Sequence, residues 1–160
     1  MDDPFAVFGL EREFEIDAAV LRSAMLRLTA QTHPDRYTDP IEQAEAAERS
    51  AAINRAYAEL KDPERRARAL LLLRGHVIDE KASPPPALLM EVMEMREAME
   101  SAIESKDSAA LAGLRADAET QRGERLAAIA AAFQRDDLEA VAGQLQGLRY
   151  VERMLEQMPG

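Results

Sequence analysis

The 160-residue sequence contains no cysteine and no tryptophan, and aromatic residues make up only 4% of it. The lack of cysteine excludes disulfides, thiolate nucleophiles and cysteine-ligated zinc or iron–sulfur centres. The longest strongly apolar run, residues 69–73, is far shorter than the roughly 20 residues that a membrane-spanning helix requires. We therefore expect no membrane segment. The first residues lack the basic and apolar regions of a signal peptide, so a cytoplasmic protein is expected.

Acidic residues outnumber basic ones, with 30 Asp and Glu against 20 Lys and Arg, and the formal net charge is −10 at pH 7. The acidic excess is larger after residue 75 than before it. A chain with this charge is poorly suited to the phosphate backbone, so no nucleic-acid partner is expected. A basic protein surface would complement the second half better.

The fold class follows from the spacing of the apolar residues. They recur at helical intervals, and clusters of β-branched residues are missing, which predicts an all-α protein. One helix begins after the cap residue Asp17 and ends before Pro34. A second helix begins at Pro40 and is long enough to pair with the first in an antiparallel hairpin. A short helix follows the Asp-Pro turn at 62–63 and ends near Gly75.

The stretch ASPPPA marks the clearest boundary in the chain, because three consecutive prolines do not fit inside a helix. Three further helices are predicted after it, over residues 86–105, 107–134 and 137–157. An antiparallel three-helix bundle is the simplest arrangement that buries their apolar stripes. We expect one domain over residues 1–75, a linker over 76–86 and a second domain over 87–160.

The stretch QTHPDRYTDP, residues 31–40, contains one of only two histidines. A catalytic His33–Asp35 pair would also require a nucleophile or a cleft, and a metal site would require further ligands. The sequence shows neither these partners nor a glycine-rich phosphate loop. From local chemistry, three interpretations remain open: a solvated turn, a docking loop, or the site of a small helical hydrolase that uses His33 and Asp35.

Three motifs in order resemble a J-domain, the module that activates DnaK-type chaperones. They are DPFAVFGLEREFEID, the His-Pro-Asp tripeptide after a helix, and INRAYAEL followed by DPERRARAL; the resemblance covers residues 2–74. It implies a loop that docks on the chaperone and stimulates its ATP hydrolysis. The implied contact residues are His33, Pro34, Asp35, Arg27 and Arg36. The chain departs from the family at Gln31, where lysine is common, and this weaker basic face indicates a specialised chaperone partner.

The segment LLMEVMEMRE, residues 88–97, has more apolar residues than one core stripe needs. On a helical wheel, the residues predicted to face the core are Leu88, Val92, Met95, Met99 and Ile103. Leu89, Met90 and Met93 fall on another side, together with Glu94 and Glu97. Methionines adapt to a partner's shape and glutamates attract basic groups, so we predict a binding face; the alternative is that these side chains pack against the first domain.

The last predicted helix contains Gly143 and Gly147 on the side of Tyr150. Each glycine costs a helix about 1 kcal/mol relative to alanine. Two interpretations are open: a close approach of another group to the backbone, or no role at all.

A J-domain followed by a short acidic three-helix bundle resembles the HscB co-chaperones of iron–sulfur cluster assembly, over essentially the whole chain. The resemblance implies two partners, an HscA/DnaK-type chaperone and the IscU-type scaffold protein, and no enzymatic activity, cofactor or metal. Ser101 stands where the family has an acidic contact. The alternative is a J-domain co-chaperone with a different client. The implied scaffold-binding residues are Leu89, Met90, Met93, Glu94, Glu97 and Tyr150.

Overall fold

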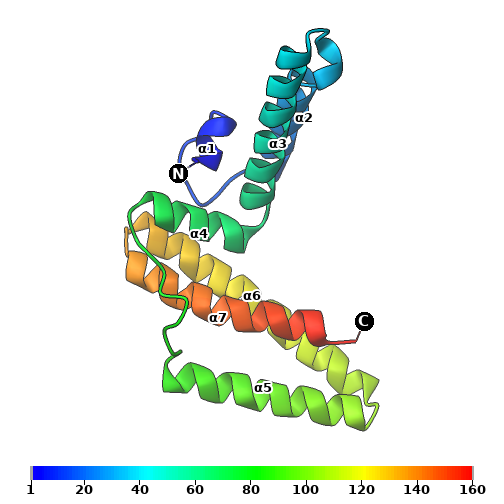
Figure 1. The fold of residues 1–160 in the computed structure, drawn as a ribbon. Coiled ribbons are helices and arrows are strands. Elements are labelled where there is room, and N and C mark those ends of the chain that lie inside the picture. Colours follow the sequence, from blue (N-terminus) through cyan, green and yellow to red (C-terminus); the bar gives the residue numbers. More distant parts are fainter. Residues whose placement is uncertain (1, 160) are drawn as a thin grey trace. The chain divides into compact units, whose positions relative to one another are not determined.

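The computed structural model describes residues 2–159, and all regular structure within this range is helical (Figure 1). The predicted all-α class is therefore confirmed. The chain divides into two compact units between Gly75 and His76. Each unit has its own buried core, so the two are described separately.

The first unit is a helical hairpin with short flanking helices (Figure 1). The antiparallel pair consists of α2 and α3, and a short 3-10 helix, η1, lies in the turn that joins them. The elements are α1 (Pro4–Val7), α2 (Ala18–Gln31), η1 (Pro34–Arg36), α3 (Pro40–Lys61) and α4 (Pro63–Leu73).

Local chemistry explains where these helices begin. The carboxylate of Asp17 accepts the backbone N–H of Ala19 at 2.9 Å and so caps α2. The carboxylate of Asp62 caps α4 in the same way, accepting the N–H of Glu64 at 3.1 Å. Proline occupies the first position of α1, α3 and α4, where its missing N–H costs nothing.

The core of the first unit lies where α1, α3 and α4 meet. Phe5, Leu60, Leu70 and Leu71 are all fully buried there. The inner side of α2 contributes Leu21, which is 2% exposed, to the hairpin. Because the core lies at one end of the long hairpin, the turn at the other end carries no fully buried side chain and is free to serve as a contact surface.

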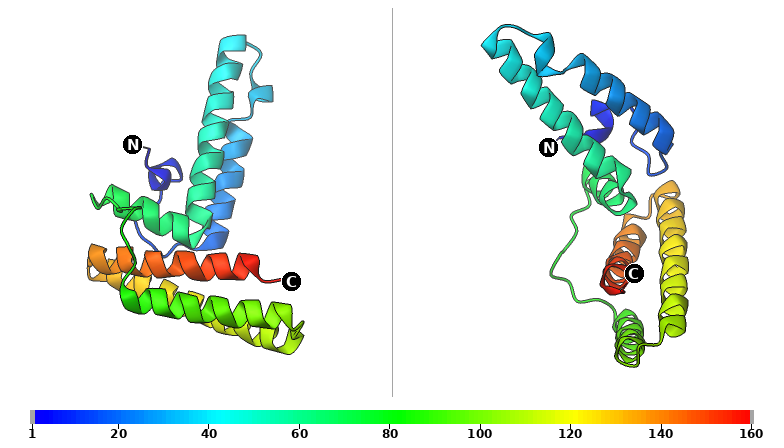
Figure 2. Two further views of the ribbon diagram at one scale, coloured as in Figure 1. Left: turned by 60° about the horizontal axis from the view of Figure 1, so that its bottom comes forward. Right: turned by 90° about the vertical axis from the view of Figure 1, so that its right-hand side faces the viewer.

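The second unit is an antiparallel three-helix bundle, as predicted. Figure 1 shows α6 and α7 running in opposite directions, and both views of Figure 2 show them close together. Ile129, Val141, Leu145 and Leu148 are fully buried, and a second cluster around Met99, Met154 and Met158 joins the three helices. The helices are α5 (Pro86–Glu104), α6 (Ser108–Gln134) and α7 (Leu138–Gln157).

The segment before α5 is not helical, but it is attached to α7 of its own unit. The side-chain amide of Gln146 donates to the carbonyl of Ala82 at 3.2 Å, and Arg149 pairs with Glu80 at 3.0 Å. These contacts fix the direction in which the chain enters α5.

The inward face of α5 differs from the prediction at one residue. Val92 and Met99 are buried as expected, whereas Ile103 is 40% exposed and the small Ala102 is buried in its place. Ile103 lies in the last turn of α5, where the chain leaves toward α6 and fewer side chains cover it. The prediction that Ile103 belongs to the core is therefore wrong.

Candidate functional site

The turn at residues 33–36 has a defined internal geometry. The Nδ1 atom of His33 accepts the backbone N–H of Asp35 at 3.2 Å, so the imidazole caps η1. The carbonyl oxygen of His33 accepts the N–H of Arg36 at 3.0 Å, and that of Pro34 accepts the N–H of Tyr37 at 3.1 Å. Proline restricts φ near −65°, which suits the first position of this short helix.

Both ends of the turn are tied to the helices beside it. On the α2 side, the hydroxyl of Ser50 donates to the carbonyl of Thr32 at 3.1 Å. On the α3 side, the amide of Gln43 donates to the carbonyl of Tyr37 at 2.7 Å. The turn is therefore stabilised by side chains of α3 in addition to the hydrogen bonds within residues 33–37.

Arg36 makes a further contact, because its guanidinium donates to the carbonyl of Ala30 at 3.1 Å. Ala30 lies in the last turn of α2, where the final carbonyls have no helical partner. Arg36 thus connects the turn to the end of α2 while its side chain remains at the surface.

The polar side chains of the turn face solvent. The side chain of Asp35 is 90% exposed and that of His33 is 55% exposed, with His33 Nδ1 lying 3.5 Å from Asp35 Oδ2. Arg27 is also exposed, about one turn before the end of α2. The structure thus places the five predicted contact residues on or beside one turn, with an exposed carboxylate at its tip.

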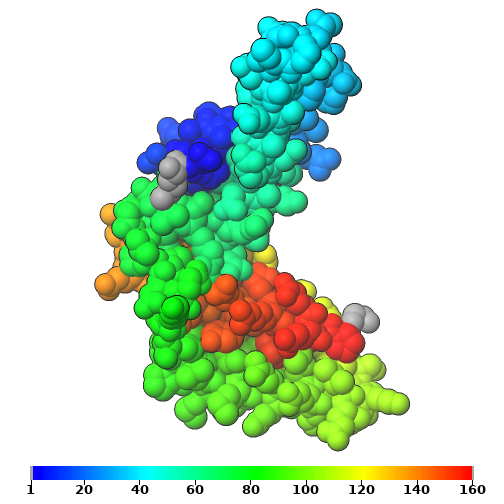
Figure 3. All heavy atoms as spheres, viewed as in Figure 1, coloured from blue at the N-terminus to red at the C-terminus, as the bar shows by residue number. Residues whose placement is uncertain are grey.

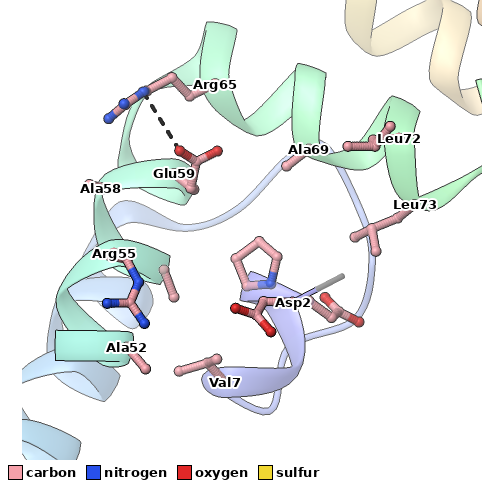
Figure 4. Close-up of a pocket in the computed structure, with 13 residues that line it drawn as sticks. Asp2, Val7, Ala52, Arg55, Ala58, Glu59, Arg65, Ala69, Leu72 and Leu73 are labelled. Carbon is pink, nitrogen blue, oxygen red and sulfur yellow. Dashed lines mark ion pairs between the residues drawn. The ribbon is translucent and has the colours of Figure 1, made fainter. Parts of the chain in front are cut away.

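A pocket of about 610 Å³ lies elsewhere in the first unit, between α1, α3 and α4 (Figure 4). Its walls are mostly apolar, and the ion pair between Arg65 and Glu59, 3.8 Å, lies beside it. Neither His33 nor Asp35 lines it, so this cleft does not supply the hydrolase interpretation with a substrate site. Within residues 2–159, no group of three or more His, Cys, Asp or Glu side chains is placed to hold a metal ion.

The outer side of α5 carries the second predicted site. Met90 is 63% exposed, Met93 60% and Leu89 40%, although methionine and leucine are usually buried. Glu94 and Glu97 are exposed on the same side of the helix. α5 lies at the surface of the second unit in Figure 3.

Tyr150 lies apart from this group in the chain, on α7, and is half-buried. Ser101, where the resemblance implies an acidic residue, is exposed on α5. The structure thus brings five of the six predicted scaffold contacts onto one helix and leaves the sixth on a neighbouring element of the same unit.

Sequence reasoning did not identify the residues that hold the His33 turn in place. Ser50 lies 18 residues from Thr32, and Gln43 lies six from Tyr37. Both belong to α3, and both use a polar side chain to satisfy a backbone carbonyl. Their roles depend on how α3 is aligned with α2, and no local sequence motif predicts that alignment.

A histidine–proline–aspartate turn at the tip of a helical hairpin, followed by a separate helical bundle, defines a J-domain protein. The family model described as "DnaJ domain" matches residues 3–69, and the one described as "HSCB C-terminal oligomerisation domain" matches residues 84–158. A "Co-chaperone protein HscB homolog" of Cupriavidus taiwanensis is 36% identical over 157 residues, covering 96% of this chain and 89% of the relative. The chain belongs to the HscB family of co-chaperones.

Solved structures of the family have the same fold. Chaperone HscB from Vibrio cholerae matches with a TM-score of 0.88 and 31% identity, covering 98% of this chain and 95% of that one. Human co-chaperone protein HscB matches with a TM-score of 0.91 and 26% identity, covering 99% and 81%. Within residues 2–159, no helix is both long and apolar enough to cross a membrane.

Proposed function

We propose that this protein stimulates ATP hydrolysis by an HscA/DnaK-type chaperone and delivers an IscU-type iron–sulfur scaffold protein to it. The observation that carries the proposal is the His33–Pro34–Asp35 turn, which is tied to both hairpin helices while its Asp35 carboxylate stays 90% exposed. Membership of the HscB family supports it. The work takes place in the cytoplasm, and its outcome is the maturation of iron–sulfur proteins.

Stimulation of this kind does not require contact with the nucleotide. The protein needs only to bind the hydrolysis-competent state of the chaperone more tightly than the other states, because a ligand shifts an equilibrium through its difference in affinity. The exposed Asp35 carboxylate suits a cationic group on the chaperone. His33 adds a directional polar contact, and Pro34 limits the shapes that the turn can adopt.

The scaffold protein binds to the outer side of α5. Leu89, Met90 and Met93 supply an adaptable apolar patch, and Glu94 and Glu97 attract basic residues around it. Linking this face to the chaperone-binding turn in one chain raises the effective concentration of the scaffold at the chaperone. The cluster itself is cargo of the scaffold.

Steady-state ATPase activity of the chaperone tests the proposal, with and without scaffold. Wild-type protein stimulates the rate, whereas His33→Gln and Asp35→Asn abolish stimulation. Asp39→Asn is the matched control, because Asp39 lies four residues from Asp35 and its side chain makes no capping bond to α3. Scaffold binding survives in all three variants, since the substitutions lie outside the second unit.

Two results would contradict this function. Wild-type protein that leaves the chaperone's ATPase rate unchanged removes the co-chaperone mechanism. Turnover of a substrate by the protein alone, lost in His33→Gln, favours the hydrolase interpretation. Stimulation without any scaffold binding keeps the J-domain function and points to a different client.

A further inference from the structure

The methionines of the second unit fall into two groups by exposure. Met90 is 63% exposed and Met93 is 60% exposed, and they lie one turn apart on α5. The other group is buried in the core where the three helices meet, and it consists of Met99, Met154 and Met158. An oxidant in the solvent therefore reaches the side chains of Met90 and Met93 first.

Methionine is the oxidisable sulfur residue of this protein. The chain contains no cysteine, so no thiol of the same chain competes for a peroxide. A lone pair of the thioether sulfur attacks one peroxide oxygen, so that an S–O bond forms and the O–O bond breaks. The departing hydroxide takes up the proton of the transferred oxygen and leaves as water. The sulfur loses two electrons, the peroxide gains them, and the product is methionine sulfoxide.

Oxidation at these two residues changes the exposed face of α5 and leaves the core of the bundle intact. The apolar patch consists of Leu89, Met90 and Met93, so two of its three side chains become polar. A sulfoxide oxygen that an apolar partner surface covers loses its hydrogen bonds to water, which weakens binding. Glu94 and Glu97 keep their charge, so the apolar part of the contact is the part that is lost.

We propose that Met90 and Met93 form a reversible oxidation site, at which a peroxide converts both thioethers to sulfoxides and releases the scaffold protein. The inference rests on the proposed function, because it assigns a regulation to the scaffold-binding face. Methionine sulfoxide reductases reverse the modification. Binding and oxidation oppose each other, since a scaffold that covers the two side chains also shields them from the peroxide.

Calorimetric titration of the scaffold measures the effect on full-length protein before and after treatment with hydrogen peroxide. The dissociation constant of wild-type protein rises about tenfold or more, and treatment with the reductases restores it. In the double variant Met90→Leu/Met93→Leu, which keeps apolar side chains that peroxide does not oxidise, it rises less than about twofold. Each protein is compared with its own untreated form, so a change in starting affinity does not affect the result.

Met25→Leu is the matched control, because Met25 is half-buried on α2 of the first unit. Its affinity for the scaffold should fall on peroxide treatment as much as that of wild-type protein does. Circular dichroism melting verifies that the treated proteins remain folded.

A second measurement uses wild-type protein alone. Peptide mass spectrometry after a short exposure to hydrogen peroxide should show sulfoxide at Met90 and Met93 before Met99. Saturating scaffold should slow oxidation of the two exposed residues relative to Met25, which serves as the reference within each sample.

Three results overturn the proposal. They are oxidation of Met99 as fast as that of Met90, an unchanged affinity when both exposed methionines are oxidised, and an equal loss of affinity in the double leucine variant. Failure of the proposed function gives a different result, because untreated wild-type protein then does not bind the scaffold at all.

Discussion

The Nδ1 atom of His33 accepts a hydrogen bond from the backbone N–H of Asp35, 3.2 Å away. Because this bond occupies Nδ1 as an acceptor, Nε2 is the ring nitrogen left to act as a donor. We therefore propose separate tasks for the two nitrogens: Nδ1 shapes the turn, and Nε2–H donates to an acceptor on the partner.

Substitution of His33 by asparagine separates these tasks. The side-chain oxygen of asparagine accepts the same N–H two residues on, so His33→Asn preserves the turn but lacks the Nε2–H donor. We expect stimulation of the chaperone's ATPase to fall about tenfold or more, while the NMR amide signals of residues 34–37 change little. The control is His76→Asn, at the other histidine, which should behave as wild type. Full stimulation by His33→Asn would show that the donor is not needed.

The outer side of α5 is tested by Leu89→Ala combined with Met93→Ala. Removing these exposed apolar side chains should weaken binding of an IscU-type scaffold about tenfold or more, as measured by titration calorimetry. Ile103→Ala is the matched control, because Ile103 lies on the same helix and is 40% exposed, as Leu89 is. ATPase stimulation in the absence of scaffold should be unchanged in both proteins. Undiminished capture by the double variant would remove this surface from the proposal.

A pH dependence is expected at the start of the chain. Burial raises the pKa of Asp3, but hydrogen bonds from Arg12 and the N–H groups of Phe5 and Ala6 outweigh it, so the pKa lies below its usual 3.8. Because the pKa of Asp3 is lower in the folded state than in the unfolded state, its charged form stabilises the fold at pH values above the unfolded-state pKa. This stabilisation is lost as the pH falls through the folded-state pKa.

Asp3→Asn should therefore lower the free energy of unfolding at neutral pH, by less than about 1 kcal/mol because Arg12 is largely exposed. The difference from wild type should shrink as the pH falls below about 4. Urea denaturation at several pH values measures both effects. Asp2→Asn serves as the control, since Asp2 does not cap α1. A constant difference across this pH range would contradict the account.

The helices were predictable because residues near each helix start determine where that helix begins. The first turns are marked by Asp17, Asp62 and the prolines at 40 and 63. These signals do not depend on the tertiary structure, since capping involves groups only two or three residues apart. The exposed face of α5 was also predictable, because periodicity separates the sides of one helix.

The features that the sequence did not predict depend on contacts between helices. The bond between Ser50 and Thr32 requires a particular alignment of α3 with α2. The exposure of Ile103 depends on where neighbouring helices stop covering α5, although its position on the wheel matches the core. Periodicity gives the direction of a side chain, and only the packing of the partner helices determines whether something covers it.

The two glycines of α7 have different surroundings. A side chain at Gly147 would collide with the guanidinium of Arg125, whereas a side chain at Gly143 would meet nothing within 4 Å. Arg125 donates to the side-chain oxygen of Gln144 at 3.2 Å and lies 3.8 Å from a carboxylate oxygen of Glu91 on α5. A close approach to the backbone thus accounts for Gly147 but not for Gly143.

Alanine at these two positions should stabilise the protein to different extents. Gly143→Ala should raise the free energy of unfolding by about 0.5–1 kcal/mol, because alanine is the better helix former. Gly147→Ala should gain less than Gly143→Ala, because the flexible guanidinium of Arg125 must move away from Gln144 and Glu91 to make room, and this offsets part of the helix gain. In an Arg125→Ala background the collision is absent, and Gly147→Ala should give the full gain of about 0.5–1 kcal/mol. Urea denaturation of the four proteins of this cycle measures the coupling, and strictly additive effects would show that Arg125 does not require a glycine here.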